Sequence, residues 1–181
     1  MFKSLNDHEV KYLVIGGVAA GVHVIGRVTY DLDILIEATL ANATRLLEAF
    51  EAAGLGTAGL TTPESLLAHE ITIFRDVVQI DVQVKAPGIE FAEAWQRREV
   101  RDFGGIEFVV VAREDLVASK RAADGQWICV TSKHSMRKIE AHSCMNRHRS
   151  HRPQRQSHVL MWVVQRFCDI TVQQIRISCW T

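Results

Sequence analysis

The sequence predicts an α/β (α+β) fold in which flanking helices cover a mixed sheet and an irregular tail follows. Three observations lead to this prediction. Residues 10–36 read as strand, glycine turn, helix and strand, and an alternating strand pattern recurs at residues 77–84. Periodic patterns stop after Gln126. The chain therefore divides into a folded part, residues 1–126, and an atypical tail, residues 127–181.

The composition changes abruptly at the same point. The whole chain of 181 residues has a formal net charge of +0 and a pI near 7.1, which gives no global argument for nucleic acid or membrane. Residues 1–126 hold all 11 glycines and 12 Lys+Arg against 19 Asp+Glu, a charge of -7. Residues 127–181 hold no glycine, all 4 cysteines and 9 Lys+Arg against 2 Asp+Glu, a charge of +7. This tail resembles the translation of a shifted reading frame, and a solvated, disordered segment is the alternative.

The first predicted strands and helices are separated by glycines or by a change of sequence pattern. "VKYLVI" (10–15) is a β-branched, apolar strand that stops at Gly16-Gly17, "VAAGVHVI" (18–25) follows as a short helix, and "DLDILI" (31–36) reads as the second strand. "TLANATRLLEAFEAAG" (39–54) predicts an amphipathic helix that Gly54 ends. Its apolar face is expected to consist of Leu40, Ala43, Leu47 and Phe50.

The second half of the folded part continues in the same way. Pro63 opens a short helix (63–70), strands at 71–74 and 77–84 form a hairpin, and a helix (90–99), a strand (106–112) and a helix (113–123) follow. In the strand at 77–84, the apolar side chains alternate with Gln79, Asp81 and Gln83. We therefore expect Asp81 on a polar face of the sheet.

Two acids stand at the start of an otherwise apolar strand. Side chains two residues apart in a strand project to the same face, roughly 6 to 7 Å apart along the chain, so Asp31 and Asp33 repel one another. A divalent cation such as Mg²⁺ (or Mn²⁺) would remove this repulsion, and Asp81 on a neighbouring strand would complete a site for one or two metals. The acid pair by itself is equally compatible with a strand end that points into solvent.

Gly16-Gly17 stands directly before a helix, where backbone N–H groups can approach the phosphates of a nucleotide. Arg27 and Thr29 precede the acids and are candidates for a phosphate contact and a hydroxyl contact. The pattern is not a dinucleotide-binding fingerprint, because the next glycine after this pair is Gly21.

These residues together resemble a known family. The "IGG" turn, the "DLD" strand and the later "QIDV" are similar to nucleotidyltransferases of the DNA polymerase beta superfamily, in the small prokaryotic branch of minimal nucleotidyltransferases and AbiEii-type toxin components. The resemblance covers about residues 5–124, and it implies the nucleotidyltransferase type of mixed sheet. It also implies that Asp31 and Asp33 are catalytic metal ligands, and that Asp81 is the third catalytic acid, which ligates metal or acts as base. By the same resemblance Gly16 and Gly17 bind phosphate, and Lys120 matches a lysine near the nucleotide site whose role stays open. Many members of the superfamily have Gly-Ser at the position of Gly16-Gly17.

The resulting hypothesis is a metal-dependent nucleotidyltransferase that moves a nucleoside monophosphate from a nucleoside triphosphate (NTP) to an acceptor hydroxyl. By resemblance, the acceptor is a tRNA or a protein, in a toxin–antitoxin pair with a cognate toxin or antitoxin. The alternative hypothesis is an inactive module of the same fold that binds a partner protein. The sequence has neither an apolar run of about 18 residues nor a signal-peptide pattern at its start, which predicts a cytoplasmic protein without membrane partners.

Overall fold

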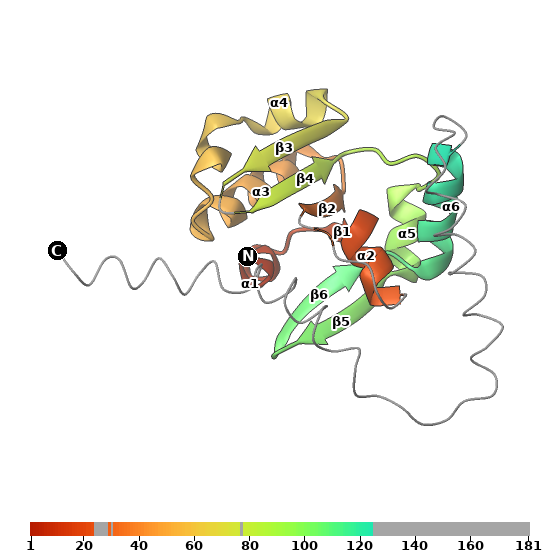
Figure 1. Ribbon diagram of the computed structural model, residues 1–181. Coiled ribbons are helices and arrows are strands. Elements are labelled where there is room, and N and C mark those ends of the chain that lie inside the picture. Colours follow the sequence, from red (N-terminus) through yellow and green to blue (C-terminus); the bar gives the residue numbers. More distant parts are fainter. Residues whose placement is uncertain (24–28, 30, 77, 125–181) are drawn as a thin grey trace, which may run out of the picture.

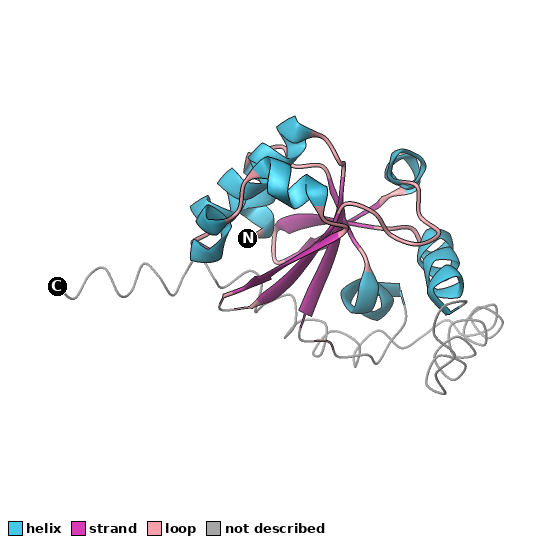
Figure 2. Cartoon of the chain, turned by 90° about the horizontal axis from the view of Figure 1, so that it is seen from above, coloured by secondary structure: helices cyan, strands magenta, loops and turns pink. Residues whose placement is uncertain are grey.

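The computed structural model describes residues 1–23, 29, 31–76 and 78–124. Within them, a six-stranded mixed sheet has helices on both of its sides (Figures 1 and 2). The strands are β1 (Tyr12–Val14), β2 (Asp31–Ile36), β3 (Ile71–Arg75), β4 (Gln79–Gln83), β5 (Glu99–Phe103) and β6 (Ile106–Val110). The helices are α1 (Phe2–Asp7), α2 (Gly16–His23), α3 (Leu40–Ala52), the 3-10 helix η1 (Gly56–Leu60), α4 (Pro63–Ala68), α5 (Phe91–Arg97) and α6 (Arg113–Asp124). The predicted α+β fold with a mixed sheet is confirmed.

The strand order β3-β4-β2-β1-β6-β5 places the two halves of the sheet on either side of the β1–β2 pair. Strand β1 pairs antiparallel with β2 and parallel with β6, and β2 pairs parallel with β4. The edge strands β3 and β5 each pair antiparallel with their neighbour, β4 and β6. Strands far apart in the sequence therefore become neighbours in the middle of the sheet.

Aromatic rings fill the side of the sheet on which α1 and α3 pack. The ring of Phe2 stacks on those of Tyr12 and Phe108, with centroids 6.1 and 5.2 Å apart. The rings of Phe50, from α3, and Phe74, from β3, meet edge to face at 5.2 Å. All five side chains are almost completely buried, and each such ring pair contributes about 0.5–1.5 kcal/mol beyond the burial of its area.

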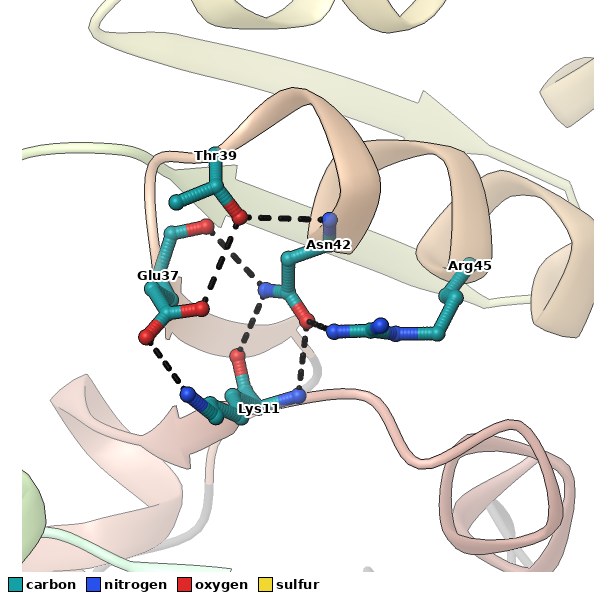
Figure 3. Close-up of polar contacts among 5 residues, drawn as sticks. All are labelled: Lys11, Glu37, Thr39, Asn42 and Arg45. Atoms are coloured by element: carbon teal, nitrogen blue, oxygen red, sulfur yellow. Dashed lines mark hydrogen bonds and ion pairs between the residues drawn. The ribbon is translucent and has the colours of Figure 1, made fainter.

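A polar junction joins the start of β1, the end of β2 and the start of α3 (Figure 3). The fully buried side chain of Asn42 accepts a hydrogen bond from the Lys11 N–H at 2.9 Å and donates to the carbonyls of Lys11 and Glu37, at 2.9 and 3.1 Å. The Thr39 hydroxyl accepts from the Asn42 N–H and caps α3, while Lys11 Nζ lies 2.7 Å from Glu37 Oε1. This junction holds the N-terminus of α3 against the sheet.

The structure departs from the sequence-based elements at several points. Residues 16 and 17 belong to helix α2 itself, so the predicted helix at 18–25 begins two residues earlier. Leu40 was expected in the core but is 52% exposed, because it is the first residue of α3, while Ala43, Leu47 and Phe50 are buried as expected. Strand β5 and helix α1 were not predicted. The tail at 127–181 lies outside the described residues.

Candidate active site

The parallel pairing of β2 with β4 brings the three predicted acids together. Asp33 and Asp81 are directly opposite one another in the register, and Asp31 lies opposite Gln79. Neighbouring strands are about 4.8 Å apart, and residues at the same register position project to the same face. Asp31, Asp33 and Asp81 therefore occupy one face of two adjacent strands, as the alternation in the sequence predicted.

The glycine turn packs directly against Asp33. Gly16 has a φ of +63°, and a Cβ atom at this position would lie 1.9 Å from Asp33 Oδ2. A Cβ at Gly17 would lie 2.8 Å from the Cβ of Thr29. Glycine is therefore required at both positions, because other side chains leave no room for a Cβ atom. At position 16 the backbone conformation also requires it.

The anion that this turn approaches in the structure is a carboxylate of the chain itself. The Gly17 N–H donates a hydrogen bond to the Asp33 side chain, and the Ile15 N–H donates to the Asp33 carbonyl at 2.9 Å. The start of α2 thus holds Asp33 in place. The expectation that Gly16 and Gly17 bind phosphate stays a prediction.

A cavity of about 270 Å³ opens beside the turn and the acids. Helix α6 forms its opposite wall with Ser119 and Lys120. The complete lining consists of Ile15, Gly16, Gly17, Thr29, Asp31, Asp33, Gln83, Pro87, Leu116, Ser119, Lys120 and Ala123. Six of the predicted site residues therefore surround one space, and Asp81 stands next to it as the neighbour of Asp33. Arg27 lies outside the described residues.

The charge distribution makes Asp33 the perturbed acid of the group. Burial raises the pKa of Asp33 above its ordinary value, and the nearby carboxylates of Asp31 and Asp81 raise it further. The Gly17 N–H and the ammonium of Lys120 act in the opposite direction without cancelling the shift. The surroundings of Asp33 thus disfavour its ionised form, and an additional cation would favour that form.

Each of the three acids accepts a hydrogen bond from a neutral side chain. The Thr29 hydroxyl donates to Asp31, Gln79 Nε2 donates to Asp81 Oδ1 at 2.9 Å, and Gln83 Nε2 makes a long contact of 3.5 Å with Asp33 Oδ1. These contacts orient the carboxylates, and the strands themselves set the face on which they lie.

The donor set suits a hard cation, since carboxylate oxygens are the ligands that Mg²⁺ prefers. Within residues 1–23, 29, 31–76 and 78–124, no three acidic, histidine or cysteine side chains converge closely enough to bind a metal ion jointly. Asp31 and Asp81 each accept a hydrogen bond from a neutral side chain instead. Coordination by all three acids would require their carboxylates to turn toward a common ion, for which each keeps lone pairs beside its hydrogen bond.

Two contacts position the helices that frame the cavity. Arg97, at the end of α5, donates to both oxygens of Asp115 in the first turn of α6, at 3.2 and 2.8 Å. His23 Nε2, at the end of α2, lies 2.8 Å from the carbonyl oxygen of Val111. These contacts tie α6 to α5, and α2 to the chain that leads into α6, so the position of Lys120 relative to Asp33 depends on them.

The sequence reasoning did not assign a role at the site to Ser119, Gln79 or Gln83. The two glutamines had a signal, because the alternation of β4 places them on the face of Asp81. Ser119 had none beyond its position next to Lys120, since nothing local indicates that α6 forms a wall of the cavity.

None of the helices in the described part of the chain has the length and apolar character required to cross a bilayer. Comparison of the chain with models of protein families and with curated proteins gives no match.

Proposed function

We propose that this chain is a metal-dependent nucleotidyltransferase that moves a nucleoside monophosphate from an NTP to an acceptor hydroxyl. One observation carries the proposal: Asp31 and Asp33 share a cavity with Gly16, Gly17 and Lys120, and Asp81 is the register partner of Asp33. Adjacent carboxylates that face a lysine across a small cavity suit a charged, phosphate-bearing substrate whose cation lies on the acidic side.

In this proposal the residues divide by charge. Asp31 and Asp33 would hold Mg²⁺ or Mn²⁺ with help from Asp81, and the ion would neutralise charge on the phosphates. Lys120, on the opposite wall, would contact the triphosphate as a point charge. The cavity of about 270 Å³ is slightly below the range of about 300–1,000 Å³ typical of ligand pockets, so it suits the triphosphate while the nucleoside extends outward.

The proposed reaction is a displacement at the α-phosphorus. The acceptor oxygen forms a bond to the α-phosphorus, the bond from this phosphorus to the bridging oxygen breaks, and pyrophosphate leaves. The proton of the acceptor hydroxyl passes to the carboxylate of Asp81, which is the acid outside the cavity lining and next to Asp33. The proposed acceptor is an RNA or a protein, with a cognate toxin or antitoxin as partner.

The test is binding and turnover of NTPs. We expect calorimetry to show NTP binding that requires Mg²⁺, and Asp33→Asn to abolish both this binding and the release of pyrophosphate. Glu107→Gln is the matched control, because Glu107 is an exposed acid on β6. If Asp33→Asn and Glu107→Gln behave alike, the proposed site is wrong.

A second candidate function is an inactive module that binds a partner protein, as an antitoxin does. The observation that favours it is that Asp31 and Asp81 each already accept a hydrogen bond from a neutral donor, Thr29 and Gln79. The same calorimetry separates the two candidates, because such a module has no metal-dependent affinity for nucleotides.

A further inference from the structure

The edge strand β3 carries two exposed isoleucines. Ile71 and Ile73 are 51% and 48% exposed, although isoleucine ranks among the residues most often buried. Phe74, on the other face of the strand, is buried against α3. Among the described residues, β3 has a strand on one side only, which is β4. Its exposed apolar side chains therefore stand beside an open edge of the sheet.

The main chain of β3 also presents hydrogen-bonding groups along this edge. The Val84 N–H donates to the Glu70 carbonyl and the Asp76 N–H donates to the Val78 carbonyl, so these two pairs bracket the hydrogen-bonded ladder with β4. In an antiparallel pair, every second residue exchanges hydrogen bonds with the partner strand, and the residues between them point their N–H and C=O groups outward. The outward residues are Ile71, Ile73 and Arg75, and their main-chain groups have no hydrogen-bond partner within the described part of the chain.

The side chains of these three residues lie on the same face of the sheet as the candidate active site. Ile73 is the register partner of Asp81, and Ile71 is the partner of Gln83, which lines the cavity. Pairs that do not exchange hydrogen bonds are the closer ones, with Cα atoms about 4.5 Å apart, so the Ile73 side chain adjoins Asp81. In Figure 1, β3 and β4 lie on the same side of the molecule as α3 and α4, and α5 and α6 lie on the other side. The acids thus stand between the cavity and an exposed, partly apolar edge of the sheet.

We propose that β3 binds an extended polypeptide segment of the acceptor, which adds to the sheet as a further strand and brings the acceptor hydroxyl toward Asp81. This inference rests on the proposed function and selects its acceptor class. A polypeptide strand matches both features of the edge, since its backbone pairs with the outward groups and its alternate side chains cover Ile71 and Ile73. RNA lacks such a backbone and cannot extend the sheet as a further strand.

The probe is a synthetic peptide of alternating valine and threonine with a central tyrosine and lysines at both ends. Amide hydrogen exchange is measured by NMR on the full chain. We expect the peptide to slow exchange at Ile71, Ile73 and Arg75 by about tenfold or more, because these amides gain partners, while Thr72 and Phe74 change little because β4 already binds them. The same peptide N-methylated at alternate residues cannot pair with the edge, and it should protect none of them.

Side-chain variants provide the second part of the experiment. Replacing both Ile71 and Ile73 by Thr keeps strand propensity but removes apolar contact, and it should weaken peptide binding by about tenfold or more. Val100→Thr is the matched control, since Val100 is 54% exposed on the opposite edge strand, β5. We expect Val100→Thr to leave peptide binding unchanged, and neither variant to alter Mg²⁺-dependent NTP binding.

The outcomes separate this inference from the function on which it rests. If the unsubstituted chain does not bind NTP, the nucleotidyltransferase proposal is refuted. If it binds NTP but the peptide does not protect the outward amides, only the proposal that β3 binds a polypeptide segment is overturned. Single-stranded polyuridylate is tested in parallel, and protection of the same amides by this RNA instead of the peptide also overturns it. Equal binding of the methylated and unmethylated peptides would show that the backbone of β3 is not the contact.

Discussion

Substitution of Gly16 by alanine tests the packing at the centre of the candidate site. Two costs add at this position. A left-handed φ of +63° costs an alanine about 1–2 kcal/mol. The new Cβ would also lie 1.9 Å from Asp33 Oδ2 and 2.8 Å from Asp33 Cβ. The carboxylate can rotate away, but Asp33 Cβ is fixed to the backbone of β2, so part of the overlap must be relieved by movement of the strand.

The expected loss of stability is the sum of these two costs. Overpacking of this kind costs about 1–3 kcal/mol, which with the backbone cost gives about 2–5 kcal/mol for Gly16→Ala. Gly104→Ala is the matched control. Gly104 has a φ of +62°, and a Cβ there would meet nothing within 4 Å. The control should therefore lose only the backbone cost, about 1–2 kcal/mol.

Urea denaturation of both variants measures the difference in the free energy of unfolding, provided that the slope of the transition is unchanged. We also expect the extra cost of Gly16→Ala to shrink in an Asp33→Ala background, because that change removes the two nearest carboxylate atoms. If Gly16→Ala and Gly104→Ala agree within about 0.5 kcal/mol, the glycine turn does not pack against Asp33 as described.

Three further predictions concern the site and the polar junction. Because the pKa of Asp33 is raised on folding, the native state binds the extra proton, so metal-free stability should fall as pH rises above 3.8 toward neutral. Asp33→Asn should remove this fall and raise the melting temperature at neutral pH, and a lowered melting temperature would contradict the assignment. Asn42→Ala should cost about 2–4 kcal/mol in urea denaturation, because buried groups of Lys11 and Glu37 lose their partner. Thr39→Ala removes the cap of α3 and a long, exposed contact of 3.5 Å with Glu37. It should cost about 1 kcal/mol, and a cost equal to that of Asn42→Ala would refute the distinction.

Local patterns were sufficient for most elements of the described part. The strand at 31–36 has the predicted bounds, and the alternation around Asp81 correctly assigned the buried and polar faces of β4. Strand β5 was missed because its residues, "EVRDF", alternate poorly and lie at the edge of the sheet, where few side chains are buried. Helix α1 has six residues, too few to show a helical period, and it is held by Phe2 packing on Tyr12 and Phe108.

The candidate site was predictable in its residue types and only partly in its arrangement. The glycine pair and the acids could be named because each stands out against an apolar strand. The wall formed by α6 and the hydrogen bonds of Thr29 and Gln79 to the acids could not be named, because they depend on how separate elements pack.

The sequence by itself determined which side chains carry charge on each strand and on which face they stand, because alternation in a β-strand is a local property of the backbone. Only the tertiary structure decided that Asp33 and Asp81 face one another. These register partners are 48 positions apart in the sequence (81 minus 33), and nothing within either strand specifies its neighbour. The same holds for Gly16, whose turn could be read from the sequence. That the turn approaches a carboxylate of the chain itself was decided by the packing of α2 against β2.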